Sequence, residues 1–240
     1  MSARMIDGPR LPPRQGSAQQ LVVLLHGYGS DGNDLIELAR HWAGLLPQAA
    51  FAAPHAPGQV PGMEAMSGGR QWFGLSEYDP GMLRRDPHHA GAIYEKLLAG
   101  AEQAAPSLDA FLDAELARHA LPADRLALVG FSQGTMMALH VGLRRRQGPA
   151  AILGYSGALV GAAKLKDQAR QPSPPILLVH GSDDDVVPLE AMFDSLNGLN
   201  EAGIPARWHL CLGLPHSIDQ EGLLLGGHFL AQSFKPDNSK

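Results

Sequence analysis

The segment Gly130–Gly134 has the residue types and spacing of a turn that presents a catalytic nucleophile. Its sequence is Gly-Phe-Ser-Gln-Gly, with the serine at position 132. In the pattern Gly-x-Ser-x-Gly, the serine stands on a sharp strand-to-helix turn that exposes its hydroxyl. The positions two residues away on either side are crowded against backbone, which favours glycine there. Because the chain contains 28 glycines, the pattern needs support from its flanking sequence.

Apolar segments flank this turn on both sides. Residues 126–129 are Leu-Ala-Leu-Val and follow the turn-like segment Pro122–Arg125, which predicts a strand buried on both faces. Residues 135–143 are mostly apolar and end at three arginines, Arg144–Arg146, as is typical of a buried helix with cations near its C-terminus. The flanks therefore provide the strand and the helix that the pattern requires.

A serine hydroxyl becomes an effective nucleophile only when a base takes its proton and a third group orients that base. Candidates for both partners follow predicted strands. The acidic segment Asp183–Asp185 follows an expected strand at 176–180, and His216 lies in a loop after an expected strand at 207–212. Spacing alone does not decide which of the three aspartates orients the base. We favour Asp184 and interpret its neighbours as helix N-terminal or solvated charges. The order Ser, Asp, His is that of α/β-hydrolases.

The chain has 11 histidines that compete for the role of base. Only His216 combines a loop at a strand end with a position after the acid. For seven of the others, bracing a loop or packing within a strand, a helix or a polar loop is the simpler role: His26, His88, His89, His119, His140, His180 and His209.

Acyl transfer also needs backbone N–H donors for the developing oxyanion. The residue after the nucleophile, Gln133, supplies one such donor. The glycine-rich segment Leu24–Gly32 follows another expected strand, and the N–H of Tyr28 is our candidate for the second donor. Alternatively, these glycines only turn the chain into a helix. The Gly-x-Gly-x-x-Gly spacing of residues 27–32 also matches a dinucleotide fingerprint, which we exclude because no acidic residue ends a second strand about twenty residues later.

Short apolar runs alternate with helical segments along the chain, which predicts an α/β fold with a mostly parallel central sheet and helices on both faces. In such a sheet, ligands bind beyond the carboxyl ends of the strands, where the candidate residues lie. The expected strands span 21–26, 49–53, 126–130, 151–155, 176–180 and 207–212. The expected helices span 31–46, 90–119 with a break near Pro106, 133–146, 189–202 and 219–233.

A length of 240 residues suits one large α/β domain. We expect residues 1–20 to form an N-terminal arm and residues 21–240 to form a single domain. The Gly/Pro-rich stretch 54–89 predicts a long loop on the substrate side. Its apolar content suggests a preference for apolar acyl groups, although the same side chains could simply cover the core: Met63, Met66, Trp72, Phe73 and Met82.

The charge and cysteine content limit the kinds of partner and compartment that we expect for this protein. A net charge of −5 with 18% charged residues gives no basic surface for nucleic acid. The single cysteine, Cys211, excludes an internal disulfide and fits a reducing compartment. Residues 1–20 contain no continuous apolar run. We therefore expect a cytoplasmic protein that acts on a neutral small molecule, with no metal, no cofactor and no integral membrane segment.

Four separated segments together resemble the phospholipase/carboxylesterase family of α/β-hydrolases, which includes the acyl-protein thioesterases. The resemblance runs from about Leu21 to Ser233 in the order of the family's motifs. The four segments are Leu25–Gly32, Gly130–Gly134, His180–Pro188 with the pattern His-Gly-x-x-Asp-x-x-Val-Pro, and Pro215–Ser217.

Matched residue by residue, the resemblance implies a set of roles. Ser132 is the nucleophile, Asp184 the acid and His216 the base. Tyr28 and Gln133 provide the oxyanion donors. The resemblance also implies that Trp72 and Phe73 belong to a tryptophan-containing loop near the substrate.

Within this family, the chain resembles the bacterial carboxylesterases more closely than the eukaryotic thioesterases. Eukaryotic thioesterases carry leucine where Tyr28 stands and a different loop between residues 54 and 89. The resemblance implies a serine carboxylesterase that cleaves small-molecule esters with short to medium acyl chains through an acyl-enzyme intermediate, without a cofactor. The alternatives are a lysophospholipase or acyl-protein thioesterase, a peptidase of the same fold, and a non-catalytic binding module. A homodimer is compatible with the resemblance, because family members often form dimers.

Overall fold

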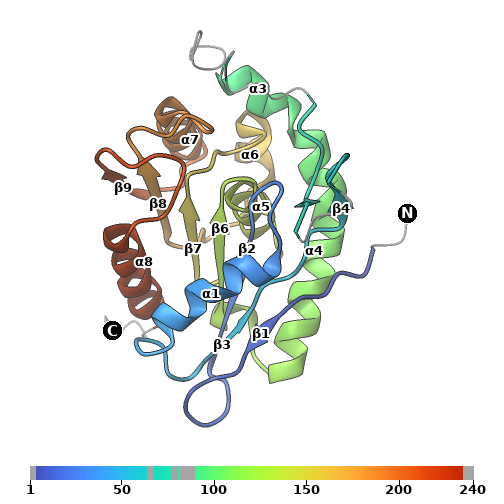
Figure 1. Cartoon of the computed structure of the whole chain (residues 1–240), viewed down its shortest axis with the longest axis vertical. Coiled ribbons are helices and arrows are strands. Elements are labelled where there is room, and N and C mark those ends of the chain that lie inside the picture. The colour runs from blue at the N-terminus through green and yellow to red at the C-terminus, as the bar shows by residue number, and fades with distance from the viewer. Residues whose placement is uncertain (1–3, 64–67, 77–80, 82–89, 235–240) are drawn as a thin grey trace.

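A seven-stranded sheet forms the centre of the protein (Figure 1). Its spatial order is β1-β3-β2-β6-β7-β8-β9. Every neighbouring pair is parallel except β1 and β3, which confirms the mostly parallel sheet predicted from the sequence. The strands are β1 (Arg10–Leu11), β2 (Gln20–Leu25), β3 (Ala49–Ala52), β6 (Leu126–Phe131), β7 (Ala151–Tyr155), β8 (Ile176–Gly181) and β9 (Arg207–Cys211).

This computed structural model describes residues 4–63, 68–76, 81 and 90–234. Within the expected loop at 54–89, two short strands, β4 (Gly58–Gln59) and β5 (Arg70–Gln71), form a separate antiparallel pair. Four residues considered above lie outside the described ranges: Met66, Met82, His88 and His89.

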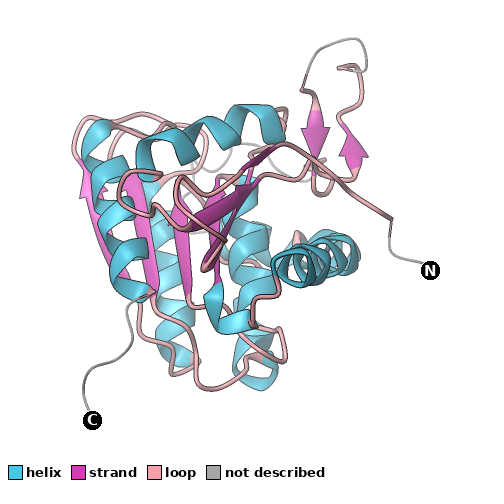
Figure 2. Cartoon of the chain, turned by 90° about the horizontal axis from the view of Figure 1, so that it is seen from below, coloured by secondary structure: helices cyan, strands magenta, loops and turns pink. Residues whose placement is uncertain are grey.

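Helices cover both faces of the sheet (Figures 1 and 2). Helices α1 (Gly32–Trp42) and α8 (Gln220–Ser233) pack on one face. The layer on the other face contains α3 (Ala90–Lys96), α4 (Leu98–His119), α5 (Gln133–Gly142), α6 (Ala162–Gln168) and α7 (Leu189–Glu201). A short 3-10 turn, η2 (Ala123–Arg125), leads into β6. No helix in the described ranges has both the length and the apolar composition needed to cross a membrane.

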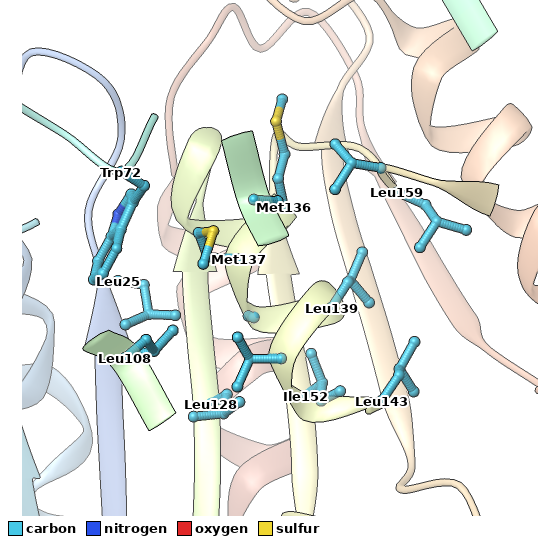
Figure 3. Close-up of a cluster of buried hydrophobic side chains, with 14 of the residues drawn as sticks. Leu25, Trp72, Leu108, Leu128, Met136, Met137, Leu139, Leu143, Ile152 and Leu159 are labelled. Carbon is cyan, nitrogen blue, oxygen red and sulfur yellow. The ribbon is translucent and has the colours of Figure 1, made fainter. Parts of the chain in front are cut away.

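The sheet divides the core into two layers because successive side chains of a strand point to opposite faces. Alternate residues of Leu21–Leu25 in β2 therefore join different clusters, one under α4 and α5 and the other under α1 and α8. Figure 3 shows the first cluster, in which Leu25, Leu108 and Leu128 lie near the helix α5 methionines. Both clusters need apolar residues, which explains why the central strands are continuous apolar runs.

The ends of the expected strands agree with the structure to within one residue, whereas the helices differ more. The break expected near Pro106 is wrong, because the chain breaks at Leu97 and Pro106 lies inside α4. Pro106 is exposed, so the hydrogen bond that proline cannot make is lost on the side of the helix that faces water.

The N-terminal residues are anchored to the domain at Arg10. Strand β1 pairs with β3, and the Arg10 guanidinium donates hydrogen bonds to both carboxylate oxygens of Glu115 in α4, at 3.0 and 2.8 Å. Glu115 is buried, so this bidentate pair connects the arm to the core. The division into an arm (1–20) and a single domain (21–240) stays a prediction.

Shortening a core side chain of β6 should destabilise the protein. Leu128 is fully buried, so Leu128→Ala should lower the free energy of unfolding by about 2–5 kcal/mol through lost burial and a residual cavity. Leu212 is 84% exposed, and Leu212→Ala should change it by no more than about 0.5 kcal/mol. Urea unfolding followed by circular dichroism measures both. Equal losses would contradict the assignment of the core.

Two buried histidines should make the fold sensitive to acid. Burial lowers the pKa of His26 to about 4, and burial together with the nearby Arg144 charge lowers the pKa of His140 to about 4. An unfolded histidine has a pKa of about 6.5, so between about pH 6.5 and 4 the unfolded chain binds protons that the folded chain does not. The free energy of unfolding should therefore fall as the pH falls through this window.

The variant His140→Leu tests this origin of acid sensitivity. The Nδ1 atom of His140 has no hydrogen-bond partner among the described residues, so leucine replaces a neutral buried ring without breaking a bond there. Urea unfolding at pH 7, 6 and 5 should give a shallower pH dependence for His140→Leu than for the wild type. His41→Leu, at an exposed position of α1, should keep the wild-type slope. An unchanged slope in His140→Leu would refute this explanation.

Candidate active site

The backbone at Ser132 makes a strained turn between β6 and α5. Its φ of 55° and ψ of −119° are unusual for a residue with a side chain, and such a conformation persists only where the surroundings hold it. The Ser132 N–H donates to the Tyr155 carbonyl at 2.9 Å, and the Thr135 hydroxyl donates to the same oxygen at 2.8 Å. The end of β7 thus holds the turn that the pentapeptide pattern predicts.

Two glycines make this turn sterically possible. A Cβ atom at position 130 would lie 2.3 Å from the backbone nitrogen of Thr135, and one at position 134 would lie 1.8 Å from the Leu25 carbonyl oxygen. Only glycine fits such spaces. The absence of a side chain at Gly134 lets the start of α5 approach the end of β2, which places Ser132 beside the loop that begins at Gly27.

Asp184 and His216 meet across the ends of β8 and β9. His216 Nδ1 lies 2.8 Å from Asp184 Oδ2. The other carboxylate oxygen, Oδ1, accepts hydrogen bonds from the N–H groups of Val186 at 3.0 Å and Val187 at 2.8 Å. Asp184 is buried, whereas Asp183 and Asp185 are exposed. Of the three adjacent aspartates, Asp184 is therefore the one that contacts His216.

The environment keeps Asp184 ionised. Burial alone would raise the pKa of its carboxyl group, but the hydrogen bond and charge of His216, with help from the Val187 N–H, hold that pKa below its ordinary value. A carboxylate only accepts hydrogen bonds, so His216 Nδ1 carries the proton. In the neutral ring, Nε2 is then free to accept a proton.

Two further side chains surround this pair. The Phe131 ring packs on the His216 ring with a centroid separation of 4.8 Å. The buried His180 donates from Nε2 to the Val187 carbonyl at 2.8 Å, and the same nitrogen lies 3.5 Å from Asp184 Oδ2. His180 therefore braces the acid loop, as its position at a strand end predicts. The contact of Phe131 with His216 has no signal in the sequence, because the loop that carries His216 lies far along the chain from Phe131.

Ser132 and His216 line one cavity of about 540 Å³. Apolar side chains form much of its wall: Leu75, Met136, Val186 and Val187. Ser30 and Asp34 line it as well, and the Ser30 hydroxyl donates to the Asp34 carboxylate at 2.7 Å. Within the described ranges, no group of three or more histidine, cysteine, aspartate or glutamate side chains could hold a metal ion.

The two candidate oxyanion donors, Tyr28 and Gln133, line the same cavity. Neither backbone N–H has an acceptor in the described part of the chain. Neutral His26 fixes the loop of Tyr28, because its Nδ1–H donates to the Gly27 carbonyl at 2.8 Å and its Nε2 accepts from the Ala56 N–H at 3.0 Å. Asp31 in the same loop also caps α1, so the loop turns the chain into that helix while Tyr28 lines the cavity.

Trp72 and Phe73 lie outside this cavity lining. Their exposed fractions are 3% and 6%, and both side chains belong to the core beneath the loop. They line a separate cavity of about 650 Å³, whereas Leu75 of the same segment reaches the cavity of Ser132. Direct contact of Trp72 or Phe73 with substrate stays a prediction.

Comparison with known proteins agrees with this geometry. The family model described as Phospholipase/Carboxylesterase matches residues 8–233. Acyl-protein thioesterase 1 of Emericella nidulans is 28% identical over 225 residues, which cover 90% of each chain. Acyl-protein thioesterase 1 of Schizosaccharomyces pombe is 30% identical over 174 residues, which cover 70% of this chain and 69% of that protein.

Solved structures show the same relationship. The esterase PE8 is 41% identical to this chain, with a TM-score of 0.82 over 95% of this chain and 99% of that one. A phospholipase/carboxylesterase from Dyadobacter fermentans is 21% identical and shares the fold, with a TM-score of 0.69. The α/β-hydrolase fold predicted from the sequence is therefore confirmed. The chain is a hydrolase of ester bonds and belongs to the phospholipase/carboxylesterase family.

Proposed function

We propose that this protein is a serine carboxylesterase that cleaves esters with short to medium acyl chains through an acyl-enzyme on Ser132. One observation carries the proposal. The hydrogen bond between His216 and Asp184 lies beside a cavity that both His216 and Ser132 line. This arrangement supports a nucleophile, a base and an orienting acid that act together.

The acylation step uses these groups in order. His216 Nε2 takes the hydroxyl proton of Ser132 while Oγ attacks the ester carbonyl carbon. The carbonyl electron pair moves to oxygen, where the N–H groups of Tyr28 and Gln133 stabilise the oxyanion. Each donor of this kind contributes on the order of 10²–10³ to kcat in a comparable enzyme. The tetrahedral intermediate then collapses, and the alcohol leaves with the proton from His216.

Deacylation repeats the chemistry with water as the nucleophile. His216 takes a proton from water, the hydroxide attacks the acyl-enzyme carbonyl, and Ser132 leaves as the protonated alcohol. Asp184 stabilises the imidazolium that forms in both steps. Its low pKa keeps it ionised and therefore able to do so.

The cavity supports a small, partly apolar substrate. A volume of about 540 Å³ falls within the range typical of small-molecule sites, roughly 300–1,000 Å³. Each methylene group buried against Leu75, Met136 or Val187 contributes about 0.8 kcal/mol to binding. The similarity to the esterase PE8 supports carboxylic esters as the substrate class.

The similarity to acyl-protein thioesterases favours thioester hydrolysis as a second candidate. The joint placement of Ser132, His216 and Asp184 argues against a non-catalytic binding module. A cytoplasmic location and a homodimer stay predictions.

Replacing the nucleophile tests the mechanism. Ser132→Ala removes the attacking oxygen, so p-nitrophenyl butyrate hydrolysis should fall by up to about 10⁶-fold in kcat, as in a protease with the same three groups. A fluorophosphonate probe should label the wild-type protein at Ser132 and leave the variant unlabelled. Ser17→Ala, at an exposed serine of the N-terminal arm, should keep both the labelling and the activity. A folded wild-type protein that neither hydrolyses the ester nor reacts with the probe would support the binding module instead.

Assays that vary the acyl length and the leaving group should distinguish the carboxylesterase, thioesterase and lysophospholipase activities. Because the cavity is of limited size, kcat/KM should be higher for p-nitrophenyl butyrate or octanoate than for the palmitate. Met136→Trp fills part of the cavity wall, so the preferred chain should become shorter. Parallel assays with acyl thioesters and lysophospholipid complete the comparison. A preference for palmitoyl thioester or for lysophospholipid would refute the carboxylesterase assignment.

A further inference from the structure

The side chain of Gln133 points away from the reaction and holds a distant segment of the chain. It is 1% exposed. Its Oε1 accepts a hydrogen bond from the Trp72 N–H at 2.9 Å, and its Nε2 donates to the Phe73 carbonyl at 2.8 Å. Both ends of the amide are therefore bound to the backbone of residues 72–73, while the N–H of the same residue is the proposed oxyanion donor.

Trp72 extends this connection to the second donor. Its indole Nε1–H donates to the His26 carbonyl at 3.0 Å, and its ring lies 5.6 Å from the His26 ring. His26 directly precedes the loop that contains Tyr28. Figure 3 shows the Trp72 ring beside Leu25, the last residue of β2. The hydrogen bonds thus run from Gln133 through Trp72 to the base of the Tyr28 loop.

A second set of bonds joins the same segments independently. The Gly29 N–H donates to the Arg70 carbonyl at 2.8 Å, and the N–H groups of Gly69 and Arg70 donate to the carbonyls of Gly29 and Ser30 at 3.0 Å. Residues 69–73 therefore contact both the Tyr28 loop and the start of α5. They form a bridge between the elements that bear the two donors.

Burial makes this bridge stiff. A buried amide or indole N–H that loses its partner leaves an unsatisfied polar group away from water, so these groups keep their positions. Oxyanion donors must lie about 2.7–3.1 Å from the developing charge, and a displacement of about 1 Å costs on the order of 10²-fold in rate. The bridge can therefore set the distance between the Tyr28 and Gln133 N–H groups.

We propose that the Gln133 side chain and the Trp72 indole are positioning residues that fix the two oxyanion donors relative to each other. This inference rests on the proposed function, because it assigns these N–H groups to the oxyanion. The competing explanation is a purely structural one, in which the same bonds only stabilise the core. The two explanations differ in what happens to kcat in a variant that remains folded.

Two variants and a matched control separate the explanations. Gln133→Met keeps the backbone N–H and approximate volume but loses both amide bonds. Trp72→Phe keeps an aromatic ring but loses the bond to His26. The control, Trp42→Phe, also loses an indole bond, since the Trp42 Nε1–H donates to the Leu223 carbonyl at 2.8 Å. Trp42 is 1% exposed and packs on the opposite face of the sheet, away from Ser132.

Kinetics and inhibition by a trifluoromethyl ketone give the readouts. The ketone forms a hemiketal with Ser132 whose oxyanion occupies the proposed donor site, so its Ki reports on the donors directly. Gln133→Met should lower kcat for p-nitrophenyl butyrate by about 10- to 100-fold, leave KM within about threefold, and raise Ki by the factor lost in kcat/KM. Trp72→Phe should act in the same direction. The double variant should lose less than the product of the single losses, because both act through residues 72–73.

The Trp42→Phe control defines which results would contradict the positioning role. Trp42→Phe should lower Tm while kcat and Ki stay at wild-type values. If folded Gln133→Met and Trp72→Phe keep wild-type kcat and Ki, or if Trp42→Phe loses as much kcat at an equal drop in Tm, the positioning role is refuted. If Gln133→Met fails to fold, Trp72→Phe decides by the same criteria. A Ser132→Ala variant that hydrolyses the ester at the wild-type rate would refute the proposed function, whereas full activity in folded bridge variants would refute only the positioning role.

Discussion

The arrangement of the site depends on the strained backbone conformation of Ser132, which the surrounding strands and helix hold in place. A residue with a side chain occupies positive φ because glycines at 130 and 134 leave room for β2, β6 and α5 to meet, and because the Tyr155 carbonyl binds the turn. Such strain, of order 1–3 kcal/mol, persists only when the surroundings compensate for it. Here the surroundings are the buried parallel strands β2, β6 and β7 at the centre of the sheet. The stability of that sheet is thus used to hold one serine at its carboxyl edge.

The candidate site gathers loops that follow four strands of this sheet. The loop after β2 carries Tyr28, the turn after β6 carries Ser132, and the loops after β8 and β9 carry Asp184 and His216. Parallel strands end at one edge, so residues far apart in the sequence come together without long excursions of the chain. Burial keeps His26 neutral in the adjoining loop, whereas the hydrogen bond and charge of His216 keep the buried Asp184 ionised.

Much of this could be predicted from the sequence, because strands buried on both faces are continuous apolar runs and the site residues follow them directly. Asp184 was favoured among three aspartates, and the structure adds the reason, which is its burial and its two backbone donors. Other features leave no local pattern. Strand β1 is two residues long, and Pro106 sits inside a helix because its position faces water. The bonds of the Gln133 side chain join segments sixty residues apart, so only the fold reveals them.

The proposed mechanism requires the Ser132 hydroxyl at the reacting carbon, the His216 imidazole beside that hydroxyl, and two N–H groups at the carbonyl oxygen. A crystal structure of the protein after reaction with an alkyl fluorophosphonate tests this directly. We predict phosphorus bonded to Ser132 Oγ, one phosphoryl oxygen about 2.7–3.1 Å from the backbone nitrogens of Tyr28 and Gln133, and His216 Nε2 beside the adduct. An adduct on another residue, or a phosphoryl oxygen directed away from both nitrogens, would contradict the mechanism.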